Sequence, residues 1–215
     1  MTHDSPPKRK YDSSRRKDQA RETRHQIAEA ARSLFIKRGY SGTTIDAIAQ
    51  EAGVAPETVY AIFSNKRKIL SHLMDISIGG DEQPIRLLDR PEPRAVLHDT
   101  DQQHQIMMIS QGISEIMGRV AHLFEIMRSA AKTEQDIEDL LNHLLNERLE
   151  NMTTFVQNIA NNGGLREGME VSAAAELVWT ITSPEVFLLL TRDRNFSQEQ
   201  YAAWLQTTLV RLLLP

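Results

Sequence analysis

The sequence predicts an all-α fold, with three closely spaced helices near the N-terminus and a larger helical part after them. Apolar residues recur at the spacing of amphipathic helices along most of the 215 residues. No segment alternates polar and apolar residues as a half-buried strand does, and glycine-containing stops separate the helical segments. We therefore expect helices packed on helices in a chain long enough to bury a core.

The first 17 residues, MTHDSPPKRKYDSSRRK, are polar, basic and contain adjacent prolines, so we expect a disordered arm. This arm either contacts a polyanion or only keeps the protein soluble. From about Asp18 the pattern becomes helical, with Ile27, Ala31 and Leu34 on one stripe. Gly39 is expected to end this helix in a left-handed conformation.

Residues 43–66 predict two short helices that cross at a tight turn. Ala49 lies four residues before Gly53, and Val59 lies six residues after it. A small side chain lets the helices approach closely, the glycine adopts a positive φ, and the branched residue packs the second helix on the first. Thr43 and Asp46 are expected to cap the first helix as a capping box.

Two further helix starts are expected at Pro56 and Lys66. Proline suits the first turn of a helix because that position needs no N–H donor. Ser64 and Asn65 offer a cap for the next helix, which opens with Lys66-Arg67-Lys68. Positive charge there opposes the helix macrodipole, which makes sense if these residues face a polyanion. The whole pattern indicates a DNA-binding helix-turn-helix, with a plain helical hairpin inside a bundle as the alternative.

The rest of the chain is expected to form further helices. The helix from Lys66 should continue to Gly79 and connect the two parts of the chain, and residues 79–101 should hold only short helical pieces, such as one around 85–88. Helical spacing resumes at Asp101, where Gly112 and Gly118 are expected to divide the stretch into two helices. Later helices are expected at 134–161, 172–182, 184–193 and from Ser197 onward.

The net charge of −4 hides an uneven distribution. Residues 1–70 carry 14 Lys or Arg against 8 Asp or Glu, whereas residues 71–215 carry 11 against 21. A basic N-terminal third with a helix-turn-helix is the electrostatic pattern of a DNA-binding head. The chain has no cysteine, no apolar signal sequence, no 18-residue apolar run and no metal-ligand spacing among its seven histidines. We therefore expect a cytoplasmic protein with no membrane span, metal or cofactor.

Two runs, IAEAARSLFIKRGY and TTIDAIAQEAGVAPETVYAIFSNKRKIL, resemble the DNA-binding domain of the TetR family of bacterial transcriptional regulators. The likeness extends from about Gln26 to Leu70, and residues 183–213 look like the C-terminal end of many members. It implies a helix-turn-helix domain at 18–66 and a helical ligand-binding and dimerisation domain at 67–215. It also implies a regulator. We expect no enzyme, because the sequence shows no nucleophile–base pair and no phosphate loop.

By position in the motif, the resemblance places Thr44, Tyr60 and Lys66 on DNA phosphates. The groove-facing positions are Ala55, Pro56, Glu57, Thr58 and Ala61. These lack the arginine, asparagine, glutamine and lysine that pair with base edges, so selectivity would come from DNA shape, water or the arm. A capping or helix-surface role for Thr44 and Thr58, and a half-buried core position for Tyr60, stay open as alternatives.

The resemblance further implies a homodimer and a ligand cavity. The candidate interface residues are Val186, Leu189, Trp204 and Leu209, with internal packing as the alternative. Methionines cluster within residues 107–127, and methionine adapts to irregular apolar shapes. The candidate pocket residues are His104, Met107, Met108, Met127, Phe155 and Trp179. A methionine stripe at helical spacing is more often ordinary core, and that alternative stays open.

Taken with the resemblance, these features imply a dimeric repressor that binds a palindromic double-stranded DNA operator. A small apolar or amphipathic effector would release it by changing the distance between the two heads, provided that it binds one state better than the other. The alternative is a ligand-independent, architectural DNA-binding protein of the same fold, in which the methionine-rich region is solid core.

Overall fold

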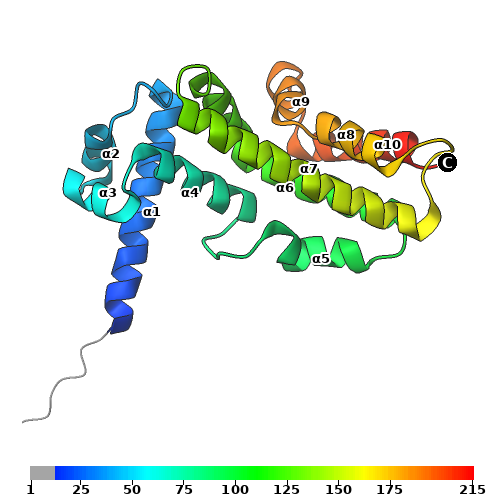
Figure 1. The fold of residues 1–215 in the computed structure, drawn as a ribbon, viewed down its shortest axis with the longest axis horizontal. Coiled ribbons are helices and arrows are strands. Elements are labelled where there is room, and N and C mark those ends of the chain that lie inside the picture. The colour runs from blue at the N-terminus through cyan, green and yellow to red at the C-terminus, as the bar shows by residue number, and fades with distance from the viewer. Residues whose placement is uncertain (1–12) are drawn as a thin grey trace, which may run out of the picture.

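The computed structural model describes residues 13–215, with side chains from Arg16 onward, and the regular elements of this part are all helical. The predicted all-α class is confirmed (Figure 1). The elements are α1 (Ser13–Arg38), α2 (Ile45–Ala52), α3 (Pro56–Phe63), α4 (Lys66–Gly79), the short 3-10 helix η1 (Leu87–Asp89), α5 (Pro91–His98), α6 (Gln102–Ala130), α7 (Gln135–Gly163), α8 (Val171–Ile181), α9 (Pro184–Leu188), the π-helical segment η2 (Leu189–Asp193) and α10 (Gln198–Leu213).

Helices α1, α2 and α3 form the head, at the left of Figure 1. Its core includes apolar residues that are each at most 3% exposed: Ile27, Ala31, Leu34, Phe35, Ile48, Ala49, Val59 and Phe63. Gly53 has a φ of 67°, as the tight turn between α2 and α3 requires. Helix α1 begins at Ser13, so residues 13–17 are helical and not part of a disordered arm. The remainder of the predicted arm, residues 1–12, lies outside the described residues.

The cap of α2 differs from the prediction by one residue. Thr44 is the N-cap, and the Ala47 N–H donates to its Oγ1 at 3.1 Å. Thr43 is buried, and its hydroxyl donates to the Gly39 carbonyl at 2.8 Å. The predicted capping box of Thr43 with Asp46 is therefore wrong, because the Thr43 hydroxyl is bound to the end of α1.

Helix α4 joins the head to the body. It follows α3, whose first residue is Pro56 as predicted, and Asn65 caps it by accepting a hydrogen bond from the Lys68 N–H at 2.9 Å. It continues to Gly79, after which Gly80 adopts a φ of 79°. Because α4 packs against α1 and α3 of the head and against α6 and α7 of the body, a movement of α4 would affect both parts.

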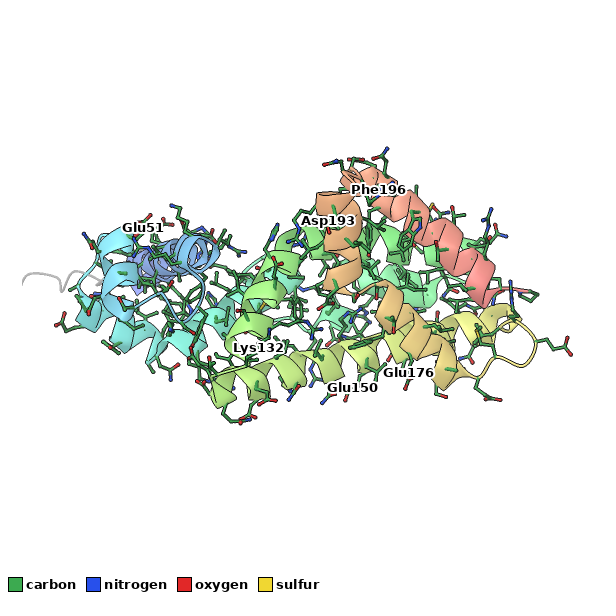
Figure 2. The ribbon with its side chains drawn as sticks, turned by 90° about the horizontal axis from the view of Figure 1, so that it is seen from above. Glu51, Lys132, Glu150, Glu176, Asp193 and Phe196 are labelled. Carbon is green, nitrogen blue, oxygen red and sulfur yellow. The ribbon has the colours of Figure 1, made fainter. Side chains whose placement is uncertain are left out.

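The body is built on the long helices α6 and α7, which pack against each other (Figure 1). Helix α6 is continuous over 29 residues, so the predicted breaks at Gly112 and Gly118 are wrong. A glycine inside a helix costs only about 0.5–1 kcal/mol relative to alanine, which is small beside the burial of the apolar stripe of α6. Helices α9 and α10 pack against α6, and α8 packs against α7. In Figure 2, Lys132 marks the α6–α7 turn on the side of the head, and Asp193 and Phe196 mark the connection into α10.

The segment before α6 is more helical than its prolines suggested. Pro91 occupies the first turn of α5, where a missing N–H is not needed, so it begins a helix of eight residues. The later starts follow the predictions. Ser183 caps α9, and Ser197 forms a capping box with Gln200 at the start of α10.

Candidate DNA-binding surface and cavity

Helix α3 has one face in the head core and one on the surface. Val59 and Phe63 are at most 2% exposed, whereas Tyr60 is 53% exposed. Tyr60 is therefore a surface residue of the head. The other positions assigned to the groove share this outward side in whole or part: Ala55, Glu57 and Ala61 are exposed, and Pro56 and Thr58 are half-buried.

Thr44 is exposed at the N-terminus of α2. Its Oγ1 accepts the hydrogen bond from the Ala47 N–H, so the capping role considered as an alternative is real. A threonine hydroxyl has one donor as well as its acceptor lone pairs. The same side chain can therefore cap α2 and donate a hydrogen bond to an external acceptor such as a phosphate oxygen.

Lys66 has internal partners that the sequence did not indicate. Its Nζ donates to the carbonyls of Tyr40 and Thr43, at 2.8 and 3.1 Å, and lies 4.0 Å from the centroid of the Tyr40 ring. Burial lowers the pKa of Lys66. Because an ammonium group has three N–H donors, Lys66 holds the loop between α1 and α2 and keeps one donor for a further acceptor.

The loop after α1 and the first turn of α4 also contact the start of α7. The Ser41 hydroxyl donates to Glu134 Oε1 at 2.6 Å, and Arg67 Nε donates to the Asp136 carbonyl at 3.0 Å. The labelled Lys132 shows in Figure 2 how the turn between α6 and α7 reaches the head. The head is thus connected to the body at this turn as well as through α4.

A cavity of about 370 Å³ lies where α4, α6, α7 and the segment after α4 meet. Its apolar walls come chiefly from α6 and α7 and include Ile113, Ile116, Met117, Val120, Phe124, Leu144 and Met152. Its polar residues include His72, Asp75, Arg90, Arg148, Asn151 and Thr182. An apolar cavity with a few polar groups is typical of a small-molecule site.

The residues predicted for the pocket lie elsewhere. Among the described residues, Met117 and Met152 line the cavity, whereas His104, Met107, Met108, Met127, Phe155 and Trp179 do not. Met108 precedes Met117 by nine residues, or two and a half turns, and therefore points to the opposite side of α6. Met127 and Phe155 are core residues, at most 7% exposed, and His104 binds Asp99 at the surface. The methionine cluster thus marked the correct helix and contains one cavity residue, Met117, but the candidates chosen from it, Met107, Met108 and Met127, do not line the cavity.

The charged or titratable groups of the cavity, among them Arg90, His72 and Arg148, escaped the sequence prediction. Arg90 forms a bidentate pair with Asp81, at 3.0 Å for both bonds, which lowers the pKa of Asp81. His72 Nε2 is buried without a hydrogen-bond partner in the described part of the chain, and burial lowers the pKa of this histidine. Burial lowers the pKa of Arg148, in α7, to about 10. No local spacing marks these residues, because only the packing of α4 on the body brings them to one cavity.

Apolar side chains are exposed or half-buried along α8, α9, η2 and α10, and Leu177 of α8 is 40% exposed. Leu189 is 54% exposed, and Val186 and Trp204 are half-buried. Leu209 is 2% exposed, so it packs in the protomer core, and its assignment to an interface is corrected.

The stretch Val171–Asp193 is apolar enough for a membrane span by length and composition, with a mean hydropathy of 1.4, although the sequence suggested no such run. Ser183 and Pro184 divide the stretch into α8, of 11 residues, and a second helical segment made of α9 and η2, of five residues each. A bilayer-spanning helix needs roughly 20 consecutive residues, so we read this stretch as an apolar surface and not as a span.

The chain is similar to known proteins in both sequence and fold. Residues 27–73 match the family model described as bacterial regulatory proteins, tetR family. The chain is 25% identical over 175 residues to the fatty acid metabolism regulator protein of Bacillus subtilis (strain 168), which covers 80% of this chain and 85% of that protein.

Two solved structures share the fold. The transcriptional regulator FadR from Bacillus subtilis in complex with stearoyl-CoA aligns with a TM-score of 0.67 and 20% identity, over 86% of this chain and 97% of that one. The SmeT–triclosan complex aligns with a TM-score of 0.70 and 16% identity, over 90% and 92% of the two chains. The likeness extends well beyond the head and includes the helical body.

Proposed function

The chain belongs to the TetR family of bacterial regulatory proteins, and we propose that it is a cytoplasmic, homodimeric repressor that a small ligand releases from its operator. That it is a DNA-binding transcription regulator and not an enzyme follows from the family. The observation that carries the proposal is α4, which begins beside the exposed face of the head and ends on the cavity. One helix therefore connects the two sites that a ligand-responsive repressor has to couple.

The proposed DNA contacts are those of the exposed side of the head. Thr44 and Tyr60 would donate to phosphates, together with the remaining donor of Lys66. The N-terminal half of α3 would face the major groove with Ala55, Pro56, Glu57, Thr58 and Ala61. Because these residues offer few hydrogen bonds to base edges, DNA shape and water would contribute much of the selectivity.

Coupling between cavity and head would pass through α4. His72 lines the cavity, and its ring centroid lies 5.4 Å from that of Phe63, the last residue of α3. A ligand that displaces His72 would therefore shift the end of α3. Such a ligand lowers operator affinity only if it binds the displaced state better than the DNA-bound state.

The effector is proposed to be a small apolar or amphipathic molecule. Its support is the composition of the cavity walls, together with stearoyl-CoA and triclosan as the ligands named for the two structural neighbours. The alternative, an architectural protein that ignores ligands, requires a solid core in place of the cavity. A volume of about 370 Å³ beside Met117 favours the ligand-responsive protein.

A second copy of this chain is proposed to cover the apolar side of α8, α9 and α10. The half-buried or exposed side chains Val186, Leu189 and Trp204 would lie in this contact. A dimer would also give each operator two half-sites, which increases the number of bases read.

The proposal is tested by selecting duplexes from a randomised library and measuring affinity by fluorescence anisotropy. The selected duplexes should contain an inverted repeat, with half-site centres about 34 Å apart or a multiple of this. Stearoyl-CoA and triclosan are the first effectors to add, followed by a library of apolar compounds. An operator affinity that no compound changes would favour the architectural alternative, and a reporter gene that the bound protein activates would contradict repression.

A further inference from the structure

Arg148 is a half-buried residue whose guanidinium points into the protein and has no acidic partner among the described residues. Its Nη2 donates to the Trp179 carbonyl and, at 2.7 Å, to Thr182 Oγ1, and its guanidinium carbon lies 5.0 Å from the centroid of the Trp179 ring. These partners are neutral. Among the described residues no carboxylate forms an ion pair with Arg148, and Glu185, whose charge acts on it, is paired with Arg128.

The other terminal nitrogen of this guanidinium, Nη1, is buried and has no hydrogen-bond partner in the described part of the chain. Arg148 also lines the cavity. With a pKa lowered by burial to about 10, the guanidinium still carries its charge at neutral pH. A buried charge without a counter-charge is unfavourable, so this position favours an anion.

The surfaces beside Arg148 are apolar. Leu144 and Met152 lie four residues before and after it in α7, and therefore on the same face of the helix. Both line the cavity, as do Ile113 and Met117 of α6, and all four are at most 7% exposed. A ligand with its charged end at Arg148 would thus have apolar surface on either side.

We propose that the cavity binds an amphipathic anion whose carboxylate pairs with Arg148 and whose apolar part lies against α6 and α7. The inference rests on the proposed function, because it names the chemical class of the effector for the same cavity. A carboxylate suits the position because its two planar oxygens match the N–H donors of a guanidinium. The competing class is a cation, which the exposed Asp75 and Glu147 at the cavity would attract.

Three ten-carbon probes separate these classes: decanoate, decanol and decylamine. Isothermal titration calorimetry at neutral pH measures their affinity for the full-length protein. Decanoate should bind at least about tenfold more tightly than decanol, because a hydrogen bond to a charged group adds that much or more. Arg148→Met should bring the two affinities within about twofold of each other. Arg94→Met, a matched loss of an exposed arginine in α5, should keep the preference.

The outcomes distinguish this inference from the function on which it rests. If decanoate and decanol bind equally and Arg148→Met changes neither affinity, the proposal of an anionic effector is wrong, while the proposal of an apolar effector still holds. Tighter binding of decylamine overturns the anion in favour of a cation. If none of the probes binds, the amphipathic effector itself fails. Should Arg148→Met not fold, Arg148→Gln keeps a donor for the Trp179 carbonyl, removes the charge and is expected to lose the same preference.

Discussion

Replacing Thr44 by aspartate should leave the head stable and abolish DNA binding. Thr44 caps α2 by accepting the Ala47 N–H at 3.1 Å, and its backbone has the extended conformation of an N-cap. Aspartate is at least as good a cap, and its charge interacts favourably with the helix macrodipole. Thr44→Ala removes the acceptor and should lower the free energy of unfolding by about 1 kcal/mol.

The two variants should have the opposite order in DNA affinity. Thr44→Ala loses one hydrogen bond to a phosphate in each head, about 1 kcal/mol, which is about 30-fold for a dimer with two heads. Thr44→Asp loses the same bond and places a carboxylate near that phosphate. At a separation of roughly 5 Å the repulsion adds about 1–3 kcal/mol per head, so the total loss should exceed about 1,000-fold.

Chemical denaturation measures the stability of these variants, and fluorescence anisotropy with a selected duplex measures their affinity. Thr43→Val is the matched control, because it loses the hydroxyl bonded to the Gly39 carbonyl but not the cap. It should lose about 1 kcal/mol of stability and keep its DNA affinity. The capping argument fails if Thr44→Asp is as unstable as Thr44→Ala. The phosphate contact is refuted if Thr44→Asp is stable and binds DNA within about threefold of wild type.

Lys66→Met should lower the free energy of unfolding by about 1–3 kcal/mol, since two carbonyls lose their donor, whereas Lys37→Met on the exposed end of α1 should change it by less than about 0.5 kcal/mol. His72→Phe should flatten the loss of thermal stability on acidification. The pKa of His72 is lowered by burial from 6.5, so protonation below that pH favours the unfolded chain, and identical pH profiles would contradict this. Leu189→Glu should yield monomers in sedimentation experiments and weaken operator binding, while Ile36→Glu, an equally exposed change in the head, should remain dimeric. A Leu189→Glu dimer would place the interface elsewhere.

The head was predictable because its information is local. The φ of Gly53, the start of α3 at Pro56 and the Asn65 cap all follow from residues a few positions apart. Between residues 43 and 66 the one error, Thr43 for Thr44, arose because adjacent threonines offer the same capping group. What decides between them is the Gly39 carbonyl at the end of α1, which binds the Thr43 hydroxyl.

The cavity was harder to predict because α6 is covered on several sides. Thirteen of its 29 residues are buried, and α4, α7, α9 and α10 all pack against it. The spacing of apolar residues reveals which side of a helix is buried when only one side is covered. In α6, some apolar residues pack in the solid core and others line the cavity, and the spacing does not distinguish the two groups. Met127 belongs to the first group and Met117 to the second, although both are buried. Arg148 was missed for a related reason, since its partners lie more than 30 residues later in α8 and in the turn after it.

The end of α4 near the cavity is held by hydrogen bonds from both the head and the body. Arg32 of the head donates to Ser77 Oγ at 2.8 Å, and Arg119 of the body donates to the Ser77 carbonyl at 2.7 Å. Contacts from the head and from the body thus converge on Ser77, two residues before the cavity residue Gly79. Hydrogen bonds of this kind contribute about 0.5–1.5 kcal/mol each, or up to about 3 kcal/mol where a partner is charged. Allosteric coupling free energies are typically about 1–3 kcal/mol, so a ligand need only disfavour one or two of these contacts to change the position of α4. If close-packed apolar side chains held α4 at this place, moving it would disrupt more favourable packing than breaking these hydrogen bonds does. The ligand would then need a larger difference in affinity between the two states.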